Sequence, residues 1–221
     1  MRAIAVAALI LIGSGCAHTR GAQPPAPSSA AAKRPSSAEL IPADVPPPSP
    51  GWTDPVDFLA LREAYGARTD FRARCEDGDA AKAAAEALVA QRFEEVVDLT
   101  SEPLRRCPVW AQLHLWRSAS LHSLGRKIEA DLHERWFFGL TDSILASGDG
   151  KSTQSPYVTI STTEEYAVLT RLGLEPRQQS LINGTPMLDL ITAVDRSGKS
   201  VSVYFNPEWH FVRLIHEISG E

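Results

Sequence analysis

Apolar residues recur at helical spacing through most of the chain between residues 56 and 146. Phe58, Leu61 and Tyr65 follow one another at three- and four-residue intervals, and Asp54-Pro55 just before them is typical of a helix start. We expect helices over residues 56–65, 80–90, 91–108, 110–124 and from residue 125 onward, with a polar loop over residues 68–78. The pattern therefore predicts a helical half, residues 51–146.

Two of these helix pairs are related by a repeat. Gln91 and Gly125 each stand at the turn inside a pair, and they are 34 residues apart, which is the period of tetratricopeptide repeats. Matching positions of that repeat are Ala84, Ser118 and Ala130 (small), Phe93 (aromatic), Gly125 (turn) and Pro108 (terminating). The departures are Gln91 for the turn glycine, Lys127 for the aromatic residue and Val96 for the alanine. The segment resembles tetratricopeptide repeats in its helix-pair architecture.

The helix expected after Gly125 has apolar residues on more than one face. One stripe consists of Leu132, Trp136 and Leu140, and a neighbouring face consists of His133, Phe137 and Ile144. A helix with this pattern is expected to be buried on two sides. We expect it to form the wall between the helical half and the remainder of the chain.

After a loop expected at residues 146–156, the apolar spacing changes from helical to alternating. Strands are expected over residues 157–161, 178–182, 187–194 and 201–205, with a turn at Asn183-Gly184. Thr162 and Glu165 have the spacing of a capping box, which predicts a helix that Gly173 ends. Residues 209–218 suit either an edge strand or a helix. The prediction is an α+β fold, in which tetratricopeptide-like helix pairs precede a small α/β half, residues 147–221, with a mostly antiparallel sheet and a packed helix.

The first residues have the pattern of an export signal. Residues 3–12 are apolar, follow Arg2 and precede Gly13-Ser14-Gly15 and Cys16. The run is too short to span a bilayer. Residues 1–15 resemble a bacterial lipoprotein signal peptide, which would leave Cys16 as the lipidated first residue and attach the protein to a membrane. Ala17 stands where an aspartate would signal inner-membrane retention, so we expect an outer-membrane lipoprotein facing the periplasm.

The alternative is an ordinary secretory signal and a soluble secreted or periplasmic protein. A tether begins directly after Cys16 and favours lipidation. Residues 17–50 are rich in proline, alanine and serine and hold almost no large apolar side chain, so we expect residues 16–50 to be disordered. Such a tether would span about 30 Å as a coil and about 100 Å when extended.

Charge and motifs exclude several classes of ligand. The formal net charge is −5, and no block of lysine or arginine is present, so we expect no nucleic-acid binding. Gly150-Lys151-Ser152 lacks the glycine that a phosphate-binding loop needs five residues earlier, because position 145 is leucine. We therefore expect no bound nucleotide. The histidine spacings indicate no metal site, and we expect no cofactor.

Cys75 and Cys107 remain after Cys16. In an oxidising compartment they can form a disulfide, and two buried thiols are the alternative. Five polar residues near the junction of the halves are candidates for an enzymatic site: His133, Asp142, Asp149, Glu165 and Tyr166. Structural roles are the simpler explanation, because Glu165 fits a helix cap and Asp149 fits a turn.

Several segments together carry a family resemblance. They are residues 147–152 (Ser-Gly-Asp-Gly-Lys-Ser), 157–161, 163–166, 172–174, 178–181 and 203–205. The chain resembles the DUF4919 family, a domain of unknown function, over roughly residues 56–205. The resemblance implies an exported protein with a helical-repeat front, and it supplies no catalytic residue.

We expect a binding function rather than an enzyme. Stacked helix pairs present a concave surface that suits a protein or peptide partner in the cell envelope. The alternative is an envelope enzyme with its site at the junction of the two halves.

Overall fold

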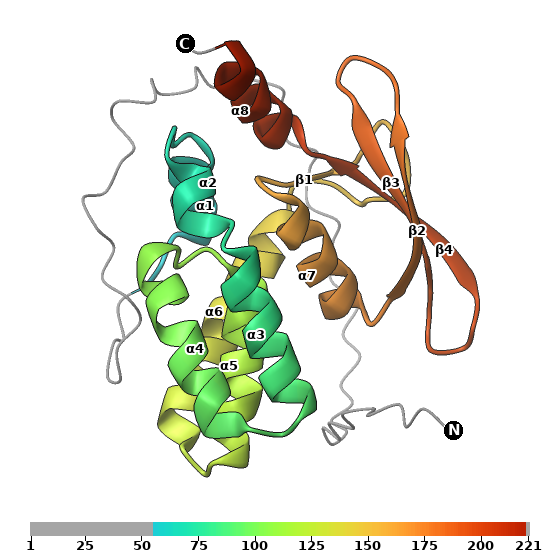
Figure 1. Cartoon of the computed structure of the whole chain (residues 1–221). Coiled ribbons are helices and arrows are strands. Elements are labelled where there is room, and N and C mark those ends of the chain that lie inside the picture. The colour runs from blue at the N-terminus through green and yellow to red at the C-terminus, as the bar shows by residue number, and fades with distance from the viewer. Residues whose placement is uncertain (1–54, 220–221) are drawn as a thin grey trace. The chain divides into compact units, whose positions relative to one another are not determined.

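The computed structural model describes residues 55–219 (Figure 1). The signal peptide, Cys16 and the tether predicted over residues 1–50 lie outside the described residues. The helices are α1 (Phe58–Gly66), α2 (Phe71–Cys75), α3 (Gly78–Val89), α4 (Phe93–Arg106), α5 (Ala111–Ser123), α6 (Lys127–Leu145), α7 (Thr162–Leu172) and α8 (Glu208–Ser219). The strands are β1 (Tyr157–Val158), β2 (Glu175–Ile182), β3 (Leu188–Val194) and β4 (Ser200–Asn206). The α+β prediction is confirmed. Within residues 55–219, no helix is both long and apolar enough to cross a membrane.

The pairs α3/α4 and α5/α6 have turns with the same backbone geometry. Gln91 and Gly125 both adopt a positive φ, 58° and 74°. The matching hydrogen bonds are Arg92 N to Ala87 O and Arg126 N to Leu121 O, each 2.9 Å. This is the left-handed ending of a helix that glycine usually occupies. Gln91 therefore adopts a conformation that glycine usually adopts.

The largest hydrophobic core draws on both halves of the chain. It includes Leu61 of α1, Trp136 of α6 and Ala167 of α7. A second core lies between α7 and the sheet, and it includes Ile144 near the end of α6. Because α6 contributes to both cores, it is buried on two sides, as its apolar pattern predicted.

The strands form one sheet in the order β1-β4-β3-β2. β1 pairs with β4 in parallel, and the other two pairs are antiparallel, so the sheet is mostly antiparallel as predicted. Helix α7 packs on one face, where Val168 and Leu169 share a core with Ile191 and Phe205. β2 lies at an edge of the sheet (Figure 1). All of its residues except Ile182 are exposed.

Two loop predictions were wrong in detail. Residues 68–78 contain the short helix α2, because Phe71 and Cys75 are four residues apart and bury the same face. The tight turn predicted at Asn183-Gly184 is a longer loop over residues 183–187, since Ile182 pairs with Leu188 across it. The ambiguous segment at residues 209–218 is the helix α8.

Candidate functional site

The five polar candidates do not converge on one site. His133 lies inside the helical half against His114, and Asp142 pairs with Arg171 at 3.1 Å on the surface. Asp149 accepts a hydrogen bond from the Lys151 amide at 2.9 Å, as a turn residue does. Glu165 and Tyr166 are brought together, because both side chains contact Gln179 of β2. The structure therefore reduces the candidate set to the α7–β2 region.

The start of α7 differs from the predicted capping box by one residue. The N-cap is Ser161 rather than Thr162, and Glu164 rather than Glu165 accepts a backbone hydrogen bond, from Ile160 N at 2.8 Å. The capping role predicted for Glu165 is therefore wrong. The shift arises because Glu164 also pairs with Arg62 of α1, whose buried guanidinium requires an opposite charge.

Arg62 and Glu164 join the helical half to the start of α7. The guanidinium makes two hydrogen bonds to the carboxylate, 2.7 and 2.8 Å, and both side chains are 3% exposed. Arg62 also donates to the carbonyl oxygen of Val158 and to the hydroxyl of Ser143. With the Ile160 amide on Glu164, this network fixes α1, α6, the β1 segment and α7 relative to one another.

Glu165 forms a buried acidic pair with Asp189. Glu165 lies on the face of α7 that carries Val168 and Leu169, and Asp189 alternates with Ile191 on the facing side of β3. Glu165 is fully buried and Asp189 is 8% exposed. Burial raises the pKa of Glu165 to about 9, and the negative charges of Asp189 and Glu164 contribute to the increase. Glu165 is therefore a protonated acid at neutral pH.

Unsatisfied oxygen atoms accompany this pair. Within the described part of the chain, Glu165 Oε1 and Thr159 Oγ1 are buried without a hydrogen-bond partner. The other oxygen, Glu165 Oε2, accepts from Gln179 Nε2 at 3.3 Å. Because Oε2 is an acceptor, the proton that Glu165 carries belongs on Oε1. A buried carboxylic acid beside a second carboxyl group, that of Asp189, is suited to acid–base chemistry if a substrate reaches it.

Gln179 links the buried pair to the surface of β2. Its Oε1 accepts from the Tyr166 hydroxyl at 2.9 Å, while its Nε2 donates to Glu165. Tyr166 is 41% exposed, and Leu181, two residues along the same face of β2, is 47% exposed. The result is an exposed surface of Tyr166, Gln179 and Leu181 beside the edge of the sheet. We call it the β2 surface.

The histidine pair inside the helical half has one set of tautomers. Arg117 Nε donates to His133 Nε2 at 3.0 Å, so the proton of neutral His133 lies on Nδ1. His133 Nδ1 then donates to His114 Nδ1 at 2.8 Å, and His114 Nε2 donates to the carbonyl oxygen of Pro108 at 2.9 Å. A further proton on either ring would have no acceptor. This chain of hydrogen bonds explains His133 as a structural residue.

The buried histidines and Glu165 predict a maximum of stability near pH 6.5. Burial lowers the pKa of His114 to about 3 and that of His133 to about 2, so stability falls as the pH drops below about 6.5, where the unfolded histidines gain protons. Glu165 has the opposite sign, because its raised folded pKa makes stability fall as the pH rises from 4.5 to about 9. Below pH 6.5 the two histidines together lower the stability more than protonation of Glu165 raises it. Urea denaturation across pH 4–9 measures the profile.

The variant Glu165→Gln tests whether Glu165 causes the loss of stability above pH 6.5. Its stability should stay level between pH 6.5 and 9, where the wild type loses on the order of 1 kcal/mol per pH unit. Glu175→Gln, at an exposed position of β2, is the matched control and should keep the wild-type slope. Parallel profiles for the wild type and Glu165→Gln would show that Glu165 is ionised in the folded protein.

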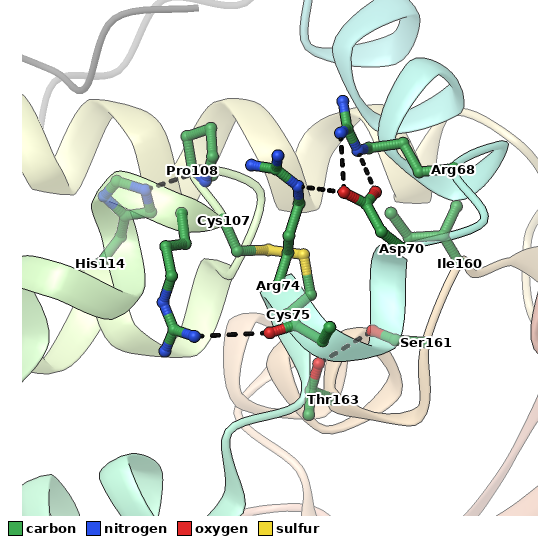
Figure 2. Close-up of a disulfide and its surroundings, with 12 residues drawn as sticks. Arg68, Asp70, Arg74, Cys75, Cys107, Pro108, His114, Ile160, Ser161 and Thr163 are labelled. Atoms are coloured by element: carbon green, nitrogen blue, oxygen red, sulfur yellow. Dashed lines mark hydrogen bonds and ion pairs between the residues drawn. A yellow bond between two sulfur atoms is a disulfide. The ribbon is translucent and has the colours of Figure 1, made fainter. Parts of the chain in front are cut away.

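Cys75 and Cys107 are joined by a disulfide with an S–S distance of 2.06 Å (Figure 2). The bond connects the end of α2 to the residue after α4. Both cysteines are buried, and Asp70 beside them accepts from Arg68 and Arg74, each at 2.6 Å. The bond holds α2 against the end of α4.

A group of potential metal ligands lies on the surface of α5 and α6. Ligand atoms of His122, Asp131 and Glu134 lie within 4.8 Å of one another. Asp131 is already paired with Lys127 at 2.7 Å, and all of these side chains are substantially exposed. Ion pairing accounts for this group.

Sequence reasoning missed Asp189 and Gln179. Asp189 carried a readable signal, because it stands at an inward-facing alternate position of an otherwise apolar strand. Gln179 carried none, since a glutamine on an exposed edge strand is ordinary in sequence. Its contacts depend on the register of β2 with β3.

The protein is of the α+β class. Its helix pairs precede the sheet in the sequence, and the edge strand β2 pairs with a neighbouring strand on one side only. No curated protein and no solved structure shows a significant match to this chain. A family model matches residues 61–211. The chain belongs to the family described as "Domain of unknown function (DUF4919)".

Proposed function

We propose that this protein is a lipid-anchored protein of the cell envelope that binds an extended segment of a partner protein at the edge of β2. The lipid would be attached to Cys16, after a signal of the lipoprotein type, with the outer membrane as the location that Ala17 favours. The observation that carries the binding role is the exposure of β2 along its length.

An open strand edge has unpaired backbone N–H and C=O groups, which an extended peptide can satisfy by adding a strand. Residues 178–182 (Gln-Gln-Ser-Leu-Ile) contain no charge and no proline to prevent such pairing. The charges on β2 lie at one end, where Glu175 and Arg177 pair with each other at 3.0 Å. The irregularity between Pro176 and Gln178 limits the pairing register at that end.

The β2 surface would provide side-chain contacts to the added strand. Tyr166 and Leu181 offer partly exposed apolar area, and Gln179 holds Tyr166 in position through its hydrogen bond. Tyrosine is a favourable contact residue because it gives a large area with little loss of conformational entropy. The preferred partner segment is therefore extended and mostly uncharged, with an apolar side chain facing Tyr166 and Leu181.

The helical half supports the same class of function. The matching turns at Gln91 and Gly125 favour a tetratricopeptide-like repeat, and stacked repeats of that kind commonly present protein-binding surfaces. In this proposal the helix pairs offer a second contact for the partner that adds its strand to β2.

Acid–base catalysis is the second candidate function, because protonated Glu165 lies beside Asp189. Both carboxyl groups are buried, so a substrate would have to displace the side chain of Gln179 to reach them. Binding at the β2 edge requires no such displacement and is the better-supported function.

Photo-crosslinking in intact cells tests the binding proposal. A photoreactive residue at Ser180 of β2 is expected to crosslink to one discrete partner protein. The same residue at Ser202 is the control, since Ser202 is exposed on the same face of the sheet but lies on β4. Ser180→Lys, which places a charge on the edge, should reduce recovery of the partner, while Ser202→Lys should not.

Three results would contradict the proposal. They are equal crosslinking from both positions, crosslinking of Ser180 to a second copy of this chain, and the absence of any Ser180 adduct. The variant Cys16→Ala separates anchoring from binding. It should release the protein from the membrane fraction without changing the crosslink that the purified protein makes to its partner.

A further inference from the structure

Helix α8 packs on the protein through a polar contact. Arg213 donates to the carbonyl oxygen of Gly66 at 2.8 Å and to that of Ile160. Its guanidinium lies over the ring of Phe71, 4.0 Å from the centroid. Trp209, four residues earlier, also packs against the large core. The inward side of α8 is therefore defined by Trp209 and Arg213.

Beyond its first residue, the exposed Glu208, the opposite side of α8 is apolar and exposed. Val212 is 44% exposed, Leu214 37% and Ile215 63%, and Phe211 is half-buried. At about 100° per residue, these four side chains occupy a sector centred roughly opposite Arg213. A surface helix normally buries its apolar stripe against the core and leaves its charged side in water. In α8 only Trp209 packs against the large core, and Val212, Leu214 and Ile215 remain exposed, so this face offers an apolar surface to a partner.

We propose that the apolar face of α8 inserts into the surface of the membrane to which Cys16 is attached. This inference rests on the proposed lipid anchor. The face comprises four side chains, which is small beside the roughly 800 Å² that each partner buries in a stable protein complex. A partner in free solution would therefore be held weakly.

The tether compensates for this weak binding when the partner is the membrane that holds the lipid anchor. A lipid on Cys16 and a tether over residues 17–50 would keep the domain within about 30–100 Å of the bilayer. Contact with the bilayer then becomes intramolecular, so a small apolar face is occupied because its effective concentration is high. One acyl chain gives marginal attachment, and a second apolar contact strengthens it.

The charges of α8 and of the whole chain indicate which type of lipid the apolar face would contact. The single arginine of the described part of α8, Arg213, faces the protein, and the net charge of the chain is −5. The apolar face of α8 therefore carries no lysine or arginine of its own to attract anionic headgroups. The face fits zwitterionic lipid, and contact with it would restrict the rotation of a domain that is otherwise held at one point.

The experiment uses the full chain with a polarity-sensitive fluorophore at Ile215→Cys. The matched control carries the fluorophore at Ile128→Cys, an exposed apolar position on α6 (74% exposed). The lipidated proteins are reconstituted on phosphatidylcholine vesicles. We expect emission at shorter wavelength from position 215 and quenching by nitroxides on the acyl chains, with neither effect at position 128.

A parallel sample tests the membrane insertion of α8 independently of lipidation at Cys16. The Cys16→Ser chain is held on the vesicles by an N-terminal histidine tag and nickel-chelating lipid, and it should give the same shift at position 215. Intact mass of the wild type independently shows whether Cys16 is lipidated. Val212→Glu should reduce quenching at position 215 about tenfold, because a charge in the apolar face opposes insertion.

Two outcomes would overturn the inference. The first is an unchanged emission at position 215 on vesicles with either form of anchor. The second is a shift that appears without vesicles and grows with protein concentration, which would assign the face to a second copy of this chain.

Discussion

Glu164→Ala is expected to lower the free energy of unfolding by about 3–5 kcal/mol. The carboxylate makes two hydrogen bonds to Arg62 in a place where both side chains are 3% exposed. Its removal leaves a guanidinium in the core without its opposite charge and leaves the Ile160 amide without its acceptor. Urea denaturation at pH 7 measures the loss.

Two variants make this prediction specific. Glu102→Ala removes the carboxylate of an exposed pair with Arg105, and it should change the stability far less than Glu164→Ala does. The double variant Arg62→Met/Glu164→Leu leaves no buried charge, so it should recover part of the stability that Glu164→Ala loses. If Glu164→Ala costs no more than Glu102→Ala, the pair does not hold the two halves together.

Removal of the disulfide is expected to cost about 3–4 kcal/mol in the double variant Cys75→Ala/Cys107→Ala. The bond joins positions separated by 32 residues, and it therefore restricts a loop of that length in the unfolded chain. In the folded chain, α2 has five residues, too few for a stable helix on its own. Loss of the bond should destabilise α2 first. Thermal unfolding of the two proteins gives the difference.

Chemical reduction provides the matching control. A reducing agent should lower the melting temperature of the wild type to about that of the double variant, and it should leave the double variant unchanged. If reduction leaves the wild type unaffected, Cys75 and Cys107 are not bonded in the protein as it is produced.

Much of the fold was predictable because its signals are local. The helix pairs follow from apolar spacing, and their 34-residue spacing placed Gln91 and Gly125 at the turns, where both have a positive φ. The short helix α2 was missed because a five-residue helix has too few positions to show a period. The nature of α8 was ambiguous because the alternation of residues 209–218 also suits an edge strand.

The candidate site was less predictable, because its contacts join distant parts of the chain. Glu165 was selected, but its role was assigned to a cap that Glu164 occupies instead. Glu164 is the residue at the start of α7 that pairs with Arg62, which lies 102 residues earlier in the chain. No local sequence pattern reveals so distant a partner. Asp189 reaches Glu165 through strand order and pairing, which the alternation of apolar residues does not specify.

The core that includes Leu61 and Ala167 has a consequence for the order of folding. Synthesis proceeds from the N-terminus, so α1 to α6 are complete before α7 exists. Until α7 emerges, Arg62 has no counter-charge, and the core around Trp136 lacks Ala167. Long-range closure of this kind slows folding and leaves apolar surface exposed in the meantime. The helical half therefore cannot complete its core alone, and it reaches its final structure together with α7.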